Sequence, residues 1–101
     1  MMDHFNKLTP AEDERLSLLC EECAEVIQAV GKITRHGYES RHPNGGPTNR
    51  TLLQYELGHV LHAISRLVNS GDIKQDEIKA AEWLKSLDVQ QYLHHQEELR
   101  E

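Results

Sequence analysis

Hydrophobic residues recur every three or four positions in the first third of the chain, the spacing of a helix with one buried side. Thr9-Pro10-Ala11-Glu12 precedes this stripe and has the features of a helix start, namely a capping threonine, a proline in the first turn and a glutamate that can complete a capping box. The pattern predicts a helix from here to about Arg35. The stripe comprises Leu16, Leu19, Cys20, Cys23, Val26, Ile27, Val30 and Ile33.

Glycine and proline interrupt the pattern between residues 37 and 47, so a loop is expected there. Thr48 or Asn49 can cap a second helix of helical hydrophobic spacing, which ends at Asn69-Ser70-Gly71. A third helix is predicted to start near Asp72 and a short fourth near Asp88. No stretch alternates as a strand does, so the predicted fold class is all-α, a helical bundle forming a single domain over residues 1–101.

The net charge, the absence of long apolar stretches and the two cysteines limit the partners and the location that we expect for this protein. With 17 acidic and 11 basic residues the formal charge is −6, and the absence of an extended basic run argues against duplex nucleic acid as a partner. No stretch is apolar enough to span a bilayer and residues 1–7 lack a signal-peptide pattern, so we expect a cytoplasmic protein with no membrane partner. Cys20 and Cys23 lie three apart on a predicted helix, a spacing that favours reduced, buried thiols over a disulfide. The alternative is that the two cysteines bind a metal ion.

Acidic residues border the hydrophobic stripes of both long helices. At about 100° per residue, Glu22 and Glu25 lie beside the first stripe, with Glu21 further toward solvent. Glu56 falls inside the second stripe, with His59 at its edge. A carboxylate that faces a core is costly without a partner, so Glu56 needs an Arg, a Lys or a cation. For four carboxylates on two helices, a shared cation is the better explanation.

These residues also form a motif. Glu21-Glu22-Cys23-Ala24-Glu25, followed on the next helix by Glu56-Leu57-Gly58-His59, resembles the MazG-like all-α nucleoside triphosphate pyrophosphohydrolases, whose pattern is Glu-Glu-x-x-Glu followed by Glu-x-x-Asp. The flanking residues 18–29, 32–37 and 55–61 are similar to the two motif helices of that family. The resemblance implies a MazG-like bundle whose pocket is completed by dimerisation or tetramerisation. It also implies hydrolysis of a nucleoside triphosphate by a metal-activated water, with release of the monophosphate and pyrophosphate.

Carried over by position, the resemblance implies ligands for Mg²⁺ at Glu22, Glu25, Glu56 and His59. Glu21 and Glu22 would be the catalytic residues, with Glu21 positioning water or a second metal ion, and the phosphate oxygens would be neutralised by Lys32 and Arg35. His59 stands where the family has Asp. Because imidazole nitrogen suits Mn²⁺ better than Mg²⁺, Mn²⁺ is the alternative or preferred ion.

Two other interpretations stay open at this point. His59 in place of Asp is also expected of a degenerate family member that binds a nucleotide without cleaving it. Without the resemblance, the same carboxylates and the Glu56-x-x-His59 pair suit a carboxylate-bridged iron or manganese site in a helical dimer. Tyr55 and Trp83 are candidates for stacking on a base, although aromatics at helical spacing more often belong to a core.

Overall fold

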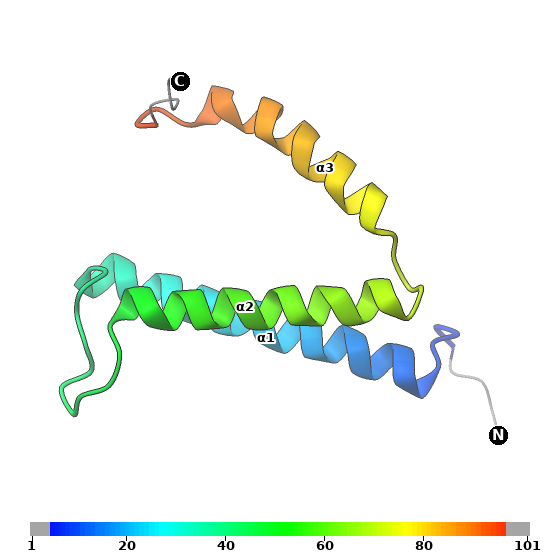
Figure 1. Cartoon of the computed structure of the whole chain (residues 1–101), viewed down its shortest axis with the longest axis horizontal. Helices are drawn as coiled ribbons and strands as arrows, with labels where there is room; N and C mark the ends of the chain where they lie inside the picture. The colour runs from blue at the N-terminus through cyan, green and yellow to red at the C-terminus, as the bar shows by residue number, and fades with distance from the viewer. Residues whose placement is uncertain (1–4, 97–101) are drawn as a thin grey trace.

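A computed structural model describes residues 5–96 of the chain. Two long helices, α1 (Pro10–His36) and α2 (Asn49–Asn69), run antiparallel as a hairpin, and α3 (Gln75–Asp88) follows with a short 3₁₀ turn, η1 (Val89–Tyr92) (Figure 1). Within the described residues there is no strand, only an isolated bridge between Arg41 and Thr48. The all-α prediction is confirmed.

The start of α1 has the predicted capping box. The Glu12 amide donates to Thr9 Oγ1 at 3.1 Å, and the Thr9 amide donates to Glu12 Oε1 at 2.8 Å, so two amides that the helix leaves unpaired are satisfied. The helix ends at His36, one residue beyond the predicted end. Gly37 follows with φ 90°, which glycine adopts without steric cost, and its amide donates to Ile33 O.

The connection from α1 to α2 is held at both ends. Asn49 is buried, and its side-chain amide donates to Gly37 O at 3.1 Å, which joins the first residue of α2 to the end of α1. The Arg50 guanidinium pairs with Glu39 at 2.9 Å and lies 4.3 Å from the centre of the Tyr38 ring. Residues 37–50 therefore fix how far α2 is offset along α1.

The turn after α2 is joined to the first part of α1. The carboxylate of Asp72 accepts two hydrogen bonds from Arg15, the shorter 2.7 Å, so Asp72 is used in this contact, close to the predicted start of α3. The helix begins three residues later, at Gln75, after Lys74, whose side chain makes no capping bond. The short fourth helix is the 3₁₀ turn η1.

The core lies between α1 and α2 and is small. Its buried hydrophobic residues are Ala29, Ala63 and Leu67. In Figure 1, α3 stands away from the hairpin. The radius of gyration is 17.8 Å, against about 13 Å for a compact domain of this length. The described chain thus forms a hairpin with an outlying helix, and the helical bundle stays a prediction. No helix in residues 5–96 is long and apolar enough to cross a membrane.

The prediction of buried cysteines is wrong for the single chain. Cys20 and Cys23 are both free thiols, as predicted, but both are exposed. The hydrophobic stripe of α1 is wider than the surface that one neighbouring helix can cover. Packing against α2 covers the side that carries Ala29 and leaves the cysteines uncovered.

Candidate metal centre

Four side chains predicted from the sequence meet at one place on the hairpin. Glu22 and Glu25 come from adjacent turns of α1, and Glu56 and His59 come from adjacent turns of α2, so each pair presents two ligand groups on one side of its helix. One ligand atom from each of the four lies within 4.8 Å of all the others. His59 Nδ1 is 3.5 Å from Glu22 Oε2 and 3.5 Å from Glu56 Oε2.

The cluster contains buried carboxylate oxygens that accept no hydrogen bond. The two oxygens are Glu22 Oε2 and Glu56 Oε2. His59 Nδ1 lies 3.5 Å from each of them and forms an ion pair with them only when the imidazole is protonated. Leaving a buried acceptor unsatisfied costs about 1–3 kcal/mol, and more when the group is charged. The sequence left an Arg or Lys partner open for Glu56, but within residues 5–96 no Arg or Lys forms an ion pair with the cluster. A cation in the cluster would satisfy both oxygens.

The electrostatics of the cluster also favour a cation. The close approach of Glu56, with which a protonated Glu25 can share a hydrogen bond, raises the pKa of Glu25. The negative charge of Glu56 and partial burial raise it further, while Glu22 and His59 act in the opposite direction. Three carboxylates held this closely repel one another when ionised, and a divalent ion between them would remove that repulsion.

The residues fit a divalent ion by distance and by chemistry. Ions with ligands at about 2.0–2.6 Å place opposite ligand atoms about 4–5 Å apart, close to the spread of the four atoms. The set offers three carboxylates and one imidazole. Carboxylate oxygens bind Mg²⁺ and Mn²⁺ alike, whereas the imidazole nitrogen of His59 favours Mn²⁺, Fe²⁺ or Zn²⁺ over Mg²⁺.

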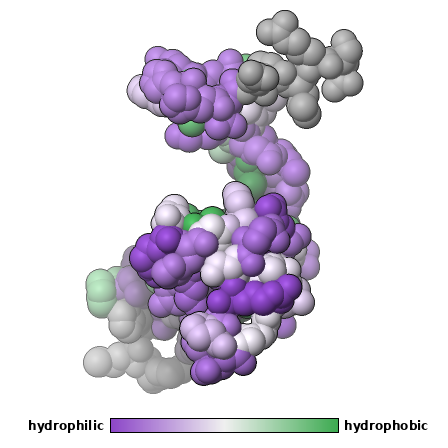
Figure 2. Space-filling model, turned by 90° about the vertical axis from the view of Figure 1, so that its left-hand side faces the viewer, coloured by the Kyte–Doolittle hydropathy of each residue, from purple (hydrophilic) through white to green (hydrophobic). Residues whose placement is uncertain are grey.

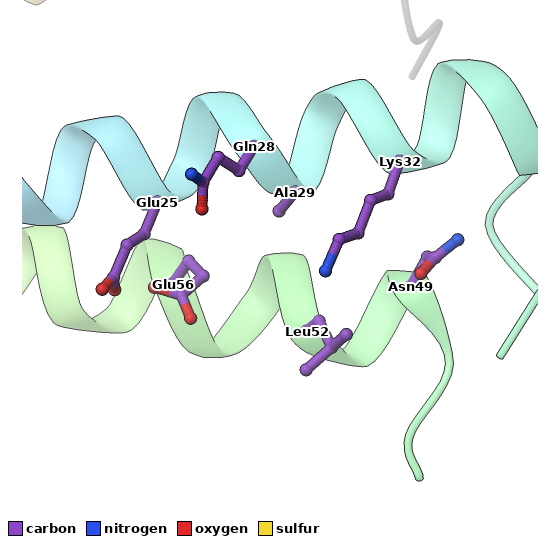
Figure 3. A pocket seen from close by; sticks show the side chains of 7 residues that line it. All are labelled: Glu25, Gln28, Ala29, Lys32, Asn49, Leu52 and Glu56. Atoms are coloured by element: carbon purple, nitrogen blue, oxygen red, sulfur yellow. The ribbon is translucent and has the colours of Figure 1, made fainter. Parts of the chain in front are cut away.

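A polar pocket of about 240 Å³ adjoins the cluster (Figure 3). Its lining includes two of the cluster carboxylates, and in Figure 3 the Lys32 side chain extends from α1 into the space between the helices. The pocket therefore combines the acidic cluster with one exposed ammonium group. The lining residues are Glu25, Gln28, Ala29, Lys32, Asn49, Leu52 and Glu56.

The remaining predicted site residues lie outside the cluster. Glu21 is exposed on α1, at a spacing of eleven residues from Lys32, which places both on the same side of the helix. Arg35 is exposed and does not line the pocket. Tyr55 and Trp83 are exposed as well, so neither belongs to the core of the single chain.

Sequence reasoning missed two pocket residues, Gln28 and Asn49. Gln28 gave no signal, since an exposed glutamine on a helix is common. Asn49 was considered only as a helix cap, whereas Thr48 performs the capping and Asn49 is buried at the edge of the pocket. Only one of two adjacent capping candidates can be the N-cap of α2. With Thr48 in that role, the sequence left the side chain of Asn49 available for another contact.

Comparison with known proteins adds no assignment: no family model matches the chain, and no curated protein or solved structure matches it significantly. The fold and the site define an all-α protein with a candidate carboxylate–imidazole metal centre on a helical hairpin.

Proposed function

We propose that the chain is a metal-dependent nucleoside triphosphate pyrophosphohydrolase, which uses water to cleave the bond between the α- and β-phosphates and releases a nucleoside monophosphate and pyrophosphate. One observation carries the proposal: four candidate ligand groups from two helices converge beside a pocket, and two of their buried oxygens accept no hydrogen bond. The sequence resemblance supplies the reaction.

The residues have distinct roles in this proposal. Glu22, Glu25, Glu56 and His59 hold the ion. A divalent ion bound there would neutralise phosphate oxygens and lower the pKa of a water molecule. Lys32, in the pocket, pairs with the phosphate oxygens, and Arg35 does so only if a bound substrate extends along α1. Glu21, on the same side of α1 as Lys32, orients the attacking water.

The charge arrangement supports an anionic substrate only in the presence of the ion. Without it, the three carboxylates of the cluster would repel a triphosphate, and Lys32 alone would not offset them. Nucleotide binding should therefore require the metal. Because of His59, we expect Mn²⁺ to support more activity than Mg²⁺.

The deciding experiment is a pyrophosphate-release assay over a panel of nucleoside triphosphates in Mn²⁺, in Mg²⁺ and with a chelator. We expect turnover in Mn²⁺, none with the chelator, and a loss of at least about 100-fold in the Glu25→Gln variant. Glu14→Gln is the matched control, because Glu14 is an exposed carboxylate of α1 outside the cluster. Nucleotide binding without turnover in either metal would refute the proposed hydrolase activity and favour a nucleotide-binding protein that does not cleave its ligand.

A second candidate function is a carboxylate-bridged iron or manganese centre. The imidazole of His59 beside two carboxylates favours it, because mixed carboxylate and histidine sets on facing helices are typical of such centres. This candidate predicts iron or manganese that stays with the protein through purification without chelators. Pyrophosphate release that depends on an added divalent ion would argue against it.

A further inference from the structure

The pocket beside the metal centre has two different ends. The residues of α2 that line it are spaced three or four apart, so they share one side of that helix. Glu56 and Asn49 are seven positions apart, which corresponds to about 10 Å at 1.5 Å per residue. The acidic cluster therefore forms one end of the pocket, and Asn49 forms the other end, next to the loop that joins the two helices.

The Asn49 end presents a hydrogen-bond acceptor whose direction is fixed. Asn49 is 7% exposed, and its side-chain nitrogen Nδ2 donates to Gly37 O at 3.1 Å. A rotated amide would bring two carbonyl oxygens against each other, so this hydrogen bond holds one orientation. Figure 3 shows the result: Nδ2 points away from the pocket, and Oδ1 lies on the side of Lys32 and Leu52. Within residues 5–96, no donor forms a hydrogen bond with this oxygen.

The Asn49 end suits the base of a nucleotide. This step rests on the proposed function, in which the ion holds the phosphates at the cluster end, and the Lys32 ammonium lies between the two ends in Figure 3. The pocket volume of about 240 Å³ is below the roughly 300–1,000 Å³ of pockets that enclose a whole drug-sized ligand. The pocket therefore takes one part of a nucleotide. The base is the part that lies farthest from the phosphates, so it reaches Asn49.

Hydrogen bonds, rather than apolar contacts, provide the selectivity at this end. Figure 2 views the hairpin from the end that carries the loop and shows a surface that is mostly hydrophilic. Among the residues that line the pocket, only Ala29 and Leu52 are apolar. A buried acceptor discriminates strongly, because a ligand with an N–H satisfies it, whereas a ligand with a carbonyl leaves two acceptors facing each other.

We propose that Asn49 is a specificity-determining residue that selects bases with an exocyclic amino group. In a pyrimidine the substituent at C4 lies opposite the glycosidic nitrogen, and in a purine the substituent at C6 lies on the far edge of the base. In both, this group reaches Asn49. The amino groups of cytosine and adenine donate to Asn49 Oδ1, whereas the oxo groups of uracil and hypoxanthine cannot donate. The pocket therefore favours cytosine and adenine nucleotides over their oxo counterparts.

The first test is a titration of the whole isotope-labelled protein with nucleosides, followed by nuclear magnetic resonance in the presence of a chelator. Nucleosides carry no phosphate, so the titration requires neither the metal nor turnover. Cytidine and uridine differ at the group that faces Asn49, and adenosine and inosine differ in the same way. We expect the amino member of each pair to bind at least about tenfold more tightly. Equal affinities within both pairs, or no binding of any nucleoside, would overturn the proposal.

Two matched variants assign the preference to Asn49. Asn49→Ala should reduce the preference within each pair to less than about twofold. Asn44→Ala is the control, because Asn44 is an exposed asparagine of the same loop that does not line the pocket, and it should keep the full preference. A preference that survives in Asn49→Ala would show that another residue selects the base.

A further comparison uses only the unchanged protein, because Asn49 also joins the two helices and its replacement perturbs the fold. Pyrimidin-2-one riboside has a hydrogen atom in place of the amino group of cytidine. It is smaller than cytidine, so a loss of affinity cannot come from a steric clash. We expect it to bind as weakly as uridine, and binding as tight as that of cytidine would contradict the role of Asn49.

These outcomes are distinct from those that test the hydrolase. Pyrophosphate release that is equally fast with CTP and UTP would support the hydrolase and refute the role of Asn49. Selection of cytidine over uridine without any pyrophosphate release would support the base site and refute the hydrolase.

Discussion

Replacing Glu56 by glutamine removes one negative charge from the cluster and leaves a side chain of nearly the same size. Without metal the change should stabilise the fold. The buried oxygen Glu56 Oε2 accepts no hydrogen bond, and the amide of glutamine can donate to the carboxylates of Glu22 and Glu25. Satisfying one buried group and relieving the repulsion is worth about 1–3 kcal/mol. For a domain of this size, each 1 kcal/mol shifts the melting temperature by about 4–8 °C.

Metal should stabilise the unchanged protein far more than the variant. An ion present at 100 times its dissociation constant stabilises the native state by about 2.7 kcal/mol. If Glu56 is a ligand, its loss weakens binding on the order of 100-fold, and the same ion concentration then contributes only about 0.4 kcal/mol. The expected rise in melting temperature falls from about 11–22 °C to about 2–3 °C.

The assay is thermal unfolding of both proteins, followed by circular dichroism at one protein concentration, first with a chelator and then over a Mn²⁺ series. Glu14→Gln serves again as the control, because it changes the same charge outside the cluster. We expect Glu56→Gln to melt higher than the unchanged protein with the chelator and to show a much smaller rise in melting temperature over the Mn²⁺ series. An equal metal-induced rise in both proteins would refute the placement of Glu56 in a metal site.

Two further predictions concern single residues. His59→Asp exchanges the imidazole for an oxygen ligand, so Mg²⁺ should bind more tightly relative to Mn²⁺ in a calorimetric titration; an unchanged ratio would show that His59 is not a ligand. For Asp72, the hydrogen bond with Arg15 lowers the pKa of the carboxyl below its usual 3.8, so the pair stabilises the fold above pH 3.8 and this contribution is lost as the pH falls through the lower native value. In Asp72→Asn, the free energy of unfolding, measured with urea, should therefore change less with pH in that acidic range. Around neutral pH, the variation of this free energy with pH should be the same in both proteins.

The parts of the structure that depend on short sequence distances were predictable. The capping box of Thr9 and Glu12 and the break at Gly37 follow from chemistry within one turn of the chain. The two pairs of candidate ligands were also predictable, because residues three apart lie on the same side of a helix. That Glu56 would need a partner followed from its position within a hydrophobic stripe.

The parts that depend on distant contacts were not predictable. The match between the two ligand pairs requires a particular offset of α2 along α1, which residues 37–50 and the bond from Asn49 to Gly37 determine. The pairing of Asp72 with Arg15 spans 57 positions, and no local pattern indicates it. The exposure of Cys20 and Cys23 depends on which part of a broad stripe faces the neighbouring helix, and periodicity alone does not specify that part.

Two buried alanines, Ala29 and Ala63, lie one helical turn beyond residues of the candidate metal centre. Ala29 follows Glu25 by one helical turn and Ala63 follows His59 by one turn, and because the helices are antiparallel the alanines lie at opposite ends of the cluster. Both are buried, and such small side chains let two helices approach closely. A larger residue at either position would push the helices apart and widen the spacing of all four ligand atoms. The size of ion that such a site would accept therefore depends on two methyl groups that are not among its candidate ligands.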